Sequence, residues 1–235
     1  MLLLAVDTSG KNGSLALART TPGQSEINVL EVVALAGGAF SAQLVPQIAA
    51  LLEKHRYGRH DLGAFAVASG PGSFTGLRVG LAAIKALGEA LQKPIVAISL
   101  LEAVACSARM SAASQRRVLA ALDAGRGDVY AGDYELGSTA ENIVTRGAMR
   151  SERLLSREEF IAECKGASII TADVALAEAG RAAGLTVELI DSPNSAVIAR
   201  LGWERLQRGE TVPPEELEAN YIRRSDAEIF SKPVP

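Results

Sequence analysis

A short run of the chain carries polar residues that could bind an anion. Between Ser69 and Gly80, Ser73 and Thr75 are candidate helix N-caps, and the free amides of a helix start can hold a phosphate or another anion. Arg78 follows three residues later and could pair with the same anion or with a nearby carboxylate. The run has neither the Lys-Ser/Thr ending of a P-loop nor a dinucleotide fingerprint. A tight turn that only starts a helix is therefore the alternative.

Two aspartates could bind a metal ion, since Asp7 and Asp123 each end a predicted buried strand at a turn. A carboxylate in that place can hold a hydrated Mg²⁺, and the alternative is a turn residue that accepts bonds from nearby amides. No companion carboxylate is recognisable, which favours the turn. The two histidines, His55 and His60, are five residues apart with a glycine between them. This spacing does not place both on one helix face, and the chain offers no other histidine as a metal ligand. We predict no metal site.

The composition limits the classes of function. The chain has 235 residues, of which 48% are hydrophobic but only 4% aromatic, so it can bury a large aliphatic core. Its net charge is −3 and no cluster of Lys and Arg exceeds a pair, which argues against a main surface for nucleic acid. Cys106 and Cys164 lack metal-ligand spacing and fit buried thiols of a reduced cytosolic protein. With no signal peptide and no apolar run of roughly 20 residues, we expect a soluble cytoplasmic protein without a membrane partner.

Hydrophobic periodicity predicts the elements that position these residues. In the first half, strands and helices are expected at 2–6, 14–19, 27–35, 41–54 (helix), 64–68, 77–91 (helix), 95–98 and 100–109 (helix). From residue 118 the chain starts again with a buried strand, an aspartate, a glycine-containing turn and a second strand. This weak repeat predicts an α/β fold with a duplicated βββαβαβα unit. We place the boundary in the polar stretch 109–115, so that residues 1–108 form one unit and residues 109–235 a shortened second unit with a C-terminal helix and tail.

The helix at 77–91 has two apolar faces, although a helix on a sheet needs only one. The second face is made mostly of small residues, at positions 76, 80, 83, 87 and 90, and either it is buried in the same chain or it packs on a partner chain. Glycine within a helix costs roughly 1 kcal/mol relative to alanine, and close packing on a partner is the compensation that we infer. On this hypothesis Gly80→Leu abolishes pairing and leaves the chain folded. If Gly80 faces its own core, the variant instead lowers the melting temperature.

Four segments, 4–9, 43–48, 70–80 and 121–130, together resemble the bacterial TsaB family, also called YeaZ. The Gly-Pro-Gly-Ser-Phe-Thr-Gly run in the third segment is quite specific, and the tail Tyr221-Ile222-Arg223 is similar to the family's closing Tyr-Leu-Arg. The resemblance covers most of the chain. It implies two actin-like (ASKHA) lobes, each a mixed five-stranded sheet with helices, the first of which carries partner-binding helices.

The resemblance also implies a function in threonylcarbamoyladenosine modification of tRNA. It implies a non-catalytic scaffold subunit that pairs with the catalytic relative TsaD through the two helices of the first lobe, and that is joined by the ATPase TsaE. We accordingly expect no catalytic residue, no cofactor, a homodimer when the chain is alone, and tRNA contact only through the complex. The expected partner interface comprises Leu44, Ile48, Gly76, Gly80, Ala83, Leu87 and Ala90, and the candidate anion-binding residues are Ser73, Thr75 and Arg78.

An enzyme is the rival class, either a phosphotransferase of the actin-like kinase superfamily or a metallopeptidase. The chain is short for a sugar kinase. The catalytic relative TsaD holds a metal through a His-x-x-x-His motif on its first helix, whereas the helix at 41–54 contains no histidine. Ala42 stands where many family members keep one histidine. This departure removes any residual case for a metal there and leaves pairing untouched.

Overall fold

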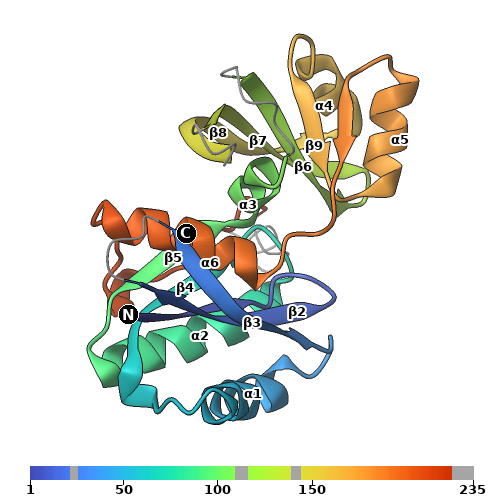
Figure 1. Cartoon of the computed structure of the whole chain (residues 1–235). Helices are drawn as coiled ribbons and strands as arrows, with labels where there is room; N and C mark the ends of the chain where they lie inside the picture. Colours follow the sequence, from blue (N-terminus) through green and yellow to red (C-terminus); the bar gives the residue numbers. More distant parts are fainter. Residues whose placement is uncertain (22–25, 109–115, 139–143, 224–235) are drawn as a thin grey trace, which may run out of the picture.

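The computed structural model describes residues 1–21, 26–108, 116–138 and 144–223, and within them the chain forms two lobes, each built on a five-stranded sheet (Figure 1). The first sheet has the order β3-β2-β1-β4-β5, from β1 (Leu2–Asp7), β2 (Gly13–Thr20), β3 (Ile27–Leu35), β4 (Leu62–Gly70) and β5 (Ile95–Ser99). The second has the order β10-β9-β6-β7-β8, from β6 (Arg116–Gly125), β7 (Asp128–Ser138), β8 (Val144–Ser156), β9 (Ser168–Thr171) and β10 (Val187–Leu189).

The helices alternate with the later strands of each sheet. They are α1 (Phe40–Lys54), α2 (Phe74–Leu91), α3 (Leu100–Cys106), α4 (Arg157–Glu163), α5 (Val174–Ala182) and α6 (Ser195–Gln207), with short 3-10 turns η1 (Arg59–Asp61) and η2 (Pro214–Glu216). No helix within the ranges that the structure describes is long and apolar enough to cross a membrane.

The two sheets have the same topology, which confirms the predicted duplication. In each sheet the first three strands pair antiparallel, and the fourth and fifth strands add in parallel beside the first. Both halves of the chain therefore follow the order βββαβαβα. This is the fold of two actin-like lobes, each a mixed five-stranded sheet with helices.

Strand β1 explains how the first sheet holds a helix layer on each face. Every residue of β1 is buried, and successive side chains point to opposite faces. Leu4 and Val6 join the core beneath α1 and α2, whereas Leu3 and Ala5 join an alanine-rich core beneath α6. Small side chains on that second face let α6 approach the sheet closely. A strand covered on both faces reads as a continuous apolar run, as this one does in the sequence.

The last helix of each half packs on the sheet of the other half. Helix α6 lies across the first sheet, and Ser195 at its start bonds to the Ser14 hydroxyl (2.9 Å) and the Ser14 carbonyl (2.7 Å) of β2. Helix α3, from the first half, packs mainly on β6 and β7 of the second sheet. The expectation that the C-terminal helix belongs to the second unit is therefore wrong, because the alanine-rich face of the first sheet needs this helix as its cover. The predicted boundary, 109–115, lies outside the described residues.

Candidate functional site

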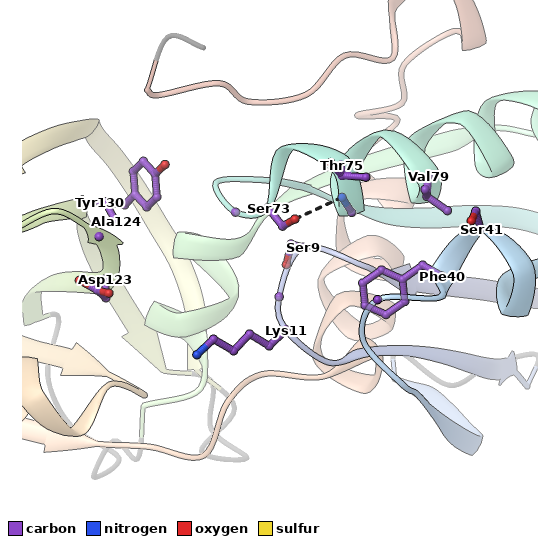
Figure 2. Close-up of a pocket in the computed structure, with 15 residues that line it drawn as sticks. Ser9, Lys11, Phe40, Ser41, Ser73, Thr75, Val79, Asp123, Ala124 and Tyr130 are labelled. Carbon is purple, nitrogen blue, oxygen red and sulfur yellow. Dashed lines mark hydrogen bonds between the residues drawn. The ribbon is translucent and has the colours of Figure 1, made fainter. Parts of the chain in front are cut away.

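A cleft between the lobes is lined by Ser73, Thr75 and Asp123, three of the polar residues that the sequence singled out (Figure 2). Its cavity has a volume of about 690 Å³. The first lobe lines it with the β1–β2 turn, the start of α1 and the turn before α2, and the second lobe lines it with the β6–β7 turn. Lys11 extends from the β1–β2 turn toward the second lobe, where Asp123 and Tyr130 form the far wall.

Ser73 and Thr75 line the cleft at the start of α2, as the anion hypothesis requires. Ser73 is the N-cap of the helix, and its hydroxyl accepts a bond from the amide of Gly76 at 3.3 Å. The amide of Ser73 donates to the Ser9 carbonyl at 2.7 Å, which ties this turn to the β1–β2 turn. The hydroxyl and one amide of the turn are thus already engaged, and anion binding by Ser73 and Thr75 stays a prediction.

Arg78 does not line the cleft with the other two candidate anion-binding residues, and anion binding by Arg78 stays a prediction. Its guanidinium carbon lies 3.7 Å from the centre of the Phe74 ring, and its Nε donates to the hydroxyl of Tyr221 at 3.2 Å. The Tyr221 ring lies 5.2 Å from the Phe74 ring, centre to centre. The side chains of Phe74 and Tyr221 thus hold Arg78 outside the cleft, and the described contacts of Arg78 include no carboxylate.

Asp7 behaves as a turn residue, the alternative that the sequence favoured. Its Oδ1 accepts bonds from the Ser9 amide at 2.8 Å and from the Ser9 hydroxyl at 2.6 Å. Burial raises the pKa of Asp7, and the two bonds from Ser9 oppose that rise. Asp123 lies across the cleft on the second lobe and is exposed. The two carboxylates sit on different lobes, and only Asp123 lines the cavity.

The histidines take part in surface contacts. His55 Nε2 lies 2.9 Å from Glu31 Oε2, and Lys54 donates to the other carboxylate oxygen at 2.7 Å. Bonds from Lys54 and His55 lower the pKa of Glu31. His60 accepts a bond from Arg59 at 3.3 Å. Among the residues that the structure describes, no three His, Cys, Asp or Glu side chains are grouped to hold a metal ion.

The two glycines expected at the partner interface face the chain's own core. A Cβ on Gly76 would collide with the Thr8 carbonyl, and a Cβ on Gly80 would collide with the Thr8 hydroxyl. Their small size lets α2 cross close to the end of β1, where the Thr8 hydroxyl donates to the Gly76 carbonyl at 2.7 Å. The compensation for glycine in this helix therefore comes from within the chain, and the assignment of Gly76 and Gly80 to a partner interface is wrong.

The assignment of Leu44 and Ile48 of α1 to a partner interface is also wrong. They are only 2% and 5% exposed and belong to the core between α1, α2 and the first sheet. Buried side chains hold the helix on its own sheet and cannot reach a partner. Ala83 and Leu87 are half-buried against this core and Ala90 is exposed, and the assignment of these three to a partner interface stays a prediction.

The structure instead places a different set of apolar residues outward. Ala82, Ala86 and Ala90 form an exposed row along α2, and Val45, which is 61% exposed, lies with exposed Ala42 and Ala49 along α1. Helices α1 and α2 pack side by side on the same face of the first sheet (Figure 1). We call these six residues the α1–α2 apolar face. One signal in the sequence could have found them: the polar strip of Arg78, Lys85 and Glu89 marks the outer side of α2, and Ala82 and Ala86 lie closer to it than Gly80 does.

A family model supports the resemblance that the motifs carry. The model described as "TsaD: tRNA N6-adenosine threonylcarbamoyltransferase" matches residues 33–229. The chain is also similar to curated proteins called "tRNA threonylcarbamoyladenosine biosynthesis protein TsaB". It is 28% identical to that of Escherichia coli (strain K12) over 97% of this chain and 96% of the relative. It is 33% identical to that of Bacillus subtilis (strain 168) over 57% of this chain and 56% of the relative.

A solved structure gives the same result for the fold. YeaZ from Pseudomonas aeruginosa superimposes with a TM-score of 0.72 at 26% sequence identity. The match covers 93% of this chain and 100% of that structure. The similarity therefore includes both lobes and the arrangement of one lobe against the other.

Proposed function

Because the chain belongs to the TsaD family, whose model spans residues 33–229, we propose that it is the accessory subunit of TsaB type in threonylcarbamoyladenosine synthesis on tRNA. The observation that carries the proposal is the match to Escherichia coli TsaB over almost the full length of both chains. A family member of this type supports a catalytic relative and performs no transfer itself. The site agrees with that role, because the buried carboxylate of Asp7 is bonded to Ser9 and α1 carries no histidine.

The α1–α2 apolar face is the surface that we propose for pairing with a TsaD-type catalytic subunit. Val45 and the alanine rows expose apolar surface on two neighbouring helices, and small side chains permit a close approach of a partner helix. A related chain has a first lobe with helices in the corresponding places, so the two chains can pack helix pair against helix pair. The proposed set keeps Ala90 from the interface expected from the sequence. It adds Ala82, Ala86, Val45, Ala42 and Ala49 in place of the buried and half-buried residues.

The remaining parts of the proposed assembly rest on the family alone. A TsaE-type ATPase joins the pair, tRNA is contacted only through the complex, and the complex acts in the cytoplasm. In the absence of the catalytic subunit, two copies of this chain pair through the same apolar face. One surface then serves two alternative partners, so the homodimer and the heterodimer exclude each other.

Co-expression with the TsaD-type protein of the same organism tests the proposal. Wild-type chain is expected to co-purify with it, and Ala86→Arg is expected to lose pairing because a charge would be buried without a partner. A loss of about 2.8 kcal/mol in binding weakens the affinity about 100-fold. Ala182→Arg, on the exposed side of α5 in the second lobe, is the matched control and should pair normally.

The outcomes separate the surface from the function. If the wild-type chain does not co-purify, the pairing function is wrong. If Ala86→Arg pairs as tightly as Ala182→Arg, the surface is wrong and the function stands. Sedimentation of each variant alone reports on the homodimer, and thermal melts show that neither variant has unfolded. Titration with Mg-ATP checks the enzyme alternative, which predicts tight binding with turnover by the isolated chain.

A further inference from the structure

The end of the described chain crosses from the first lobe to the second. In residues 217–223, which we call the strap, Leu217 is buried in the core beneath α2 and the first sheet, and Ile222 packs on the core between α3 and the second sheet. Between these anchors, the Asn220 amide donates to the Ser69 carbonyl of β4 at 2.7 Å. The strap is thus anchored in both lobes within seven residues.

Arg223 fastens the strap to the turn that forms the far wall of the cleft. Its guanidinium donates to the carbonyls of Ala124 at 2.9 Å and Gly125 at 3.4 Å, and to the carboxylate of Asp128. Ala124 and Gly125 also line the cavity. One side chain of the strap therefore holds three groups of the β6–β7 turn, with the ion pair to Asp128 only partly exposed to solvent.

A single carboxylate joins the strap to both lobes. Glu152 of β8 accepts bonds from the Ser99 hydroxyl at 2.5 Å, the Asn220 side-chain amide at 2.5 Å, and the Tyr134 hydroxyl. Ser99 ends the last strand of the first sheet, Tyr134 lies on β7 of the second sheet, and Asn220 belongs to the strap. Burial and the charge of Glu152 raise the pKa of Tyr134, so this phenol stays a donor.

The first lobe provides a fitted seat for the strap. Gly70 has a φ of +116°, and a Cβ there would lie 3.0 Å from the Asn220 carbonyl oxygen and 3.1 Å from Leu77. Only glycine allows both that backbone angle and that approach. Beside this seat, Tyr221 rests against Phe74 and accepts the bond from Arg78 at the start of α2.

We propose that the strap fixes the angle between the two lobes and so holds the cleft closed. Its contacts reach both lobes: Tyr221 meets the first turn of α2, beside the cleft, and Arg223 meets the β6–β7 turn, which lines the cleft. When the cleft opens, the two lobes move apart, and the strap can keep its contacts with only one of them. Release of Arg223 from Asp128 therefore precedes opening. The proposal is independent of the pairing surface, because none of these contacts involves the α1–α2 apolar face.

A distance measurement across the cleft tests the strap. Spin labels are placed at Glu53→Cys on α1 and Glu158→Cys on α4, both exposed positions, in a chain with Cys106→Ala and Cys164→Ala. Arg223→Ala and Asp128→Asn are each expected to shift the distance distribution to longer values and to broaden it. The double variant is expected to match Arg223→Ala, because Asp128→Asn removes only one of the three bonds that the Arg223 side chain makes. Arg153→Ala is the control, since it removes an ion pair to Glu163 within the second lobe.

Hydrogen exchange on the chain with its native cysteines provides a second measurement. In Arg223→Ala the Asn220 amide is expected to exchange at least about tenfold faster than in Arg153→Ala, while amides of β1 and β6 keep their protection. Faster exchange with an unchanged distance distribution would show that the strap does not set the lobe angle. Unchanged exchange would show that Arg223 does not hold the strap. Either result overturns the proposal.

Discussion

Substitution of Gly80 tests how α2 packs on its own sheet. The residue lies where α2 crosses the end of β1, and a Cβ there would collide with Thr8 Oγ1 while lying 3.6 Å from both Thr8 Cβ and Val6 Cγ1. The two 3.6 Å approaches are ordinary van der Waals contacts. The collision with the hydroxyl is the obstacle, because that hydroxyl donates to the Gly76 carbonyl at 2.7 Å in a buried place.

The expected cost of Gly80→Ala follows from three effects. Overpacking a tight contact costs about 1–3 kcal/mol. Losing the Thr8–Gly76 bond costs about 0.5–1.5 kcal/mol. The change from glycine to alanine in a helix returns about 1 kcal/mol. The net loss is about 2 kcal/mol, and at about 2–4 °C per kcal/mol for a chain of this size the melting temperature falls by about 4–8 °C.

A double-mutant cycle with Thr8→Ala isolates the collision. In the Thr8→Ala background the obstructing hydroxyl is absent, so Gly80→Ala is expected to be neutral or to stabilise the chain by up to about 1 kcal/mol. Thermal melts of the four proteins measure the coupling. Equal losses in both backgrounds, or a wild-type melt for Gly80→Ala alone, would refute the packing argument. Gly80→Leu, expected from the sequence to leave the chain folded, should melt still earlier than Gly80→Ala.

Two further predictions concern ionisable groups. Asp7→Asn is expected to stabilise the chain at about pH 7 and to lose this advantage at about pH 4. The reason is that burial raises the pKa of Asp7 in the folded chain. The neutral carboxyl contributes its full stability below the ordinary pKa of 3.8, and this stability is lost as pH rises through the pKa of the folded chain. Denaturant unfolding of both proteins across this range measures it, and a difference that does not vary with pH would count against it. Burial raises the pKa of the Cys164 thiol to about 12, so iodoacetamide near about pH 8 should label half-buried Cys106 and spare Cys164 until the chain unfolds. Mass spectrometry of the peptides reports the labelling, and a modified Cys164 in the native chain contradicts the prediction.

The architecture was predictable because its signals are local. The buried strand, aspartate and glycine turn recur at the start of each half, and both observed sheets grow from that pattern. The α2 interface was misplaced because apolar periodicity cannot tell a glycine that faces its own backbone from one that faces a partner. The residue that decides it, Thr8, lies 68 residues before Gly76 in the chain. The contact of Arg78 with Tyr221 was not predictable for the same reason, since the two residues are 143 positions apart in the chain.

The exchange of last helices between the halves has a consequence for how the chain is made. Residues 195–207 supply the helix that covers the alanine-rich face of the first sheet, so this face stays exposed to water until these residues have left the ribosome. The amino-terminal half cannot complete its fold before α6 is made, and one face of the second sheet lacks a cover unless α3 is attached. Although the sequence repeats, neither repeat is an autonomous folding unit, and a vector that encodes one half alone should yield aggregated protein.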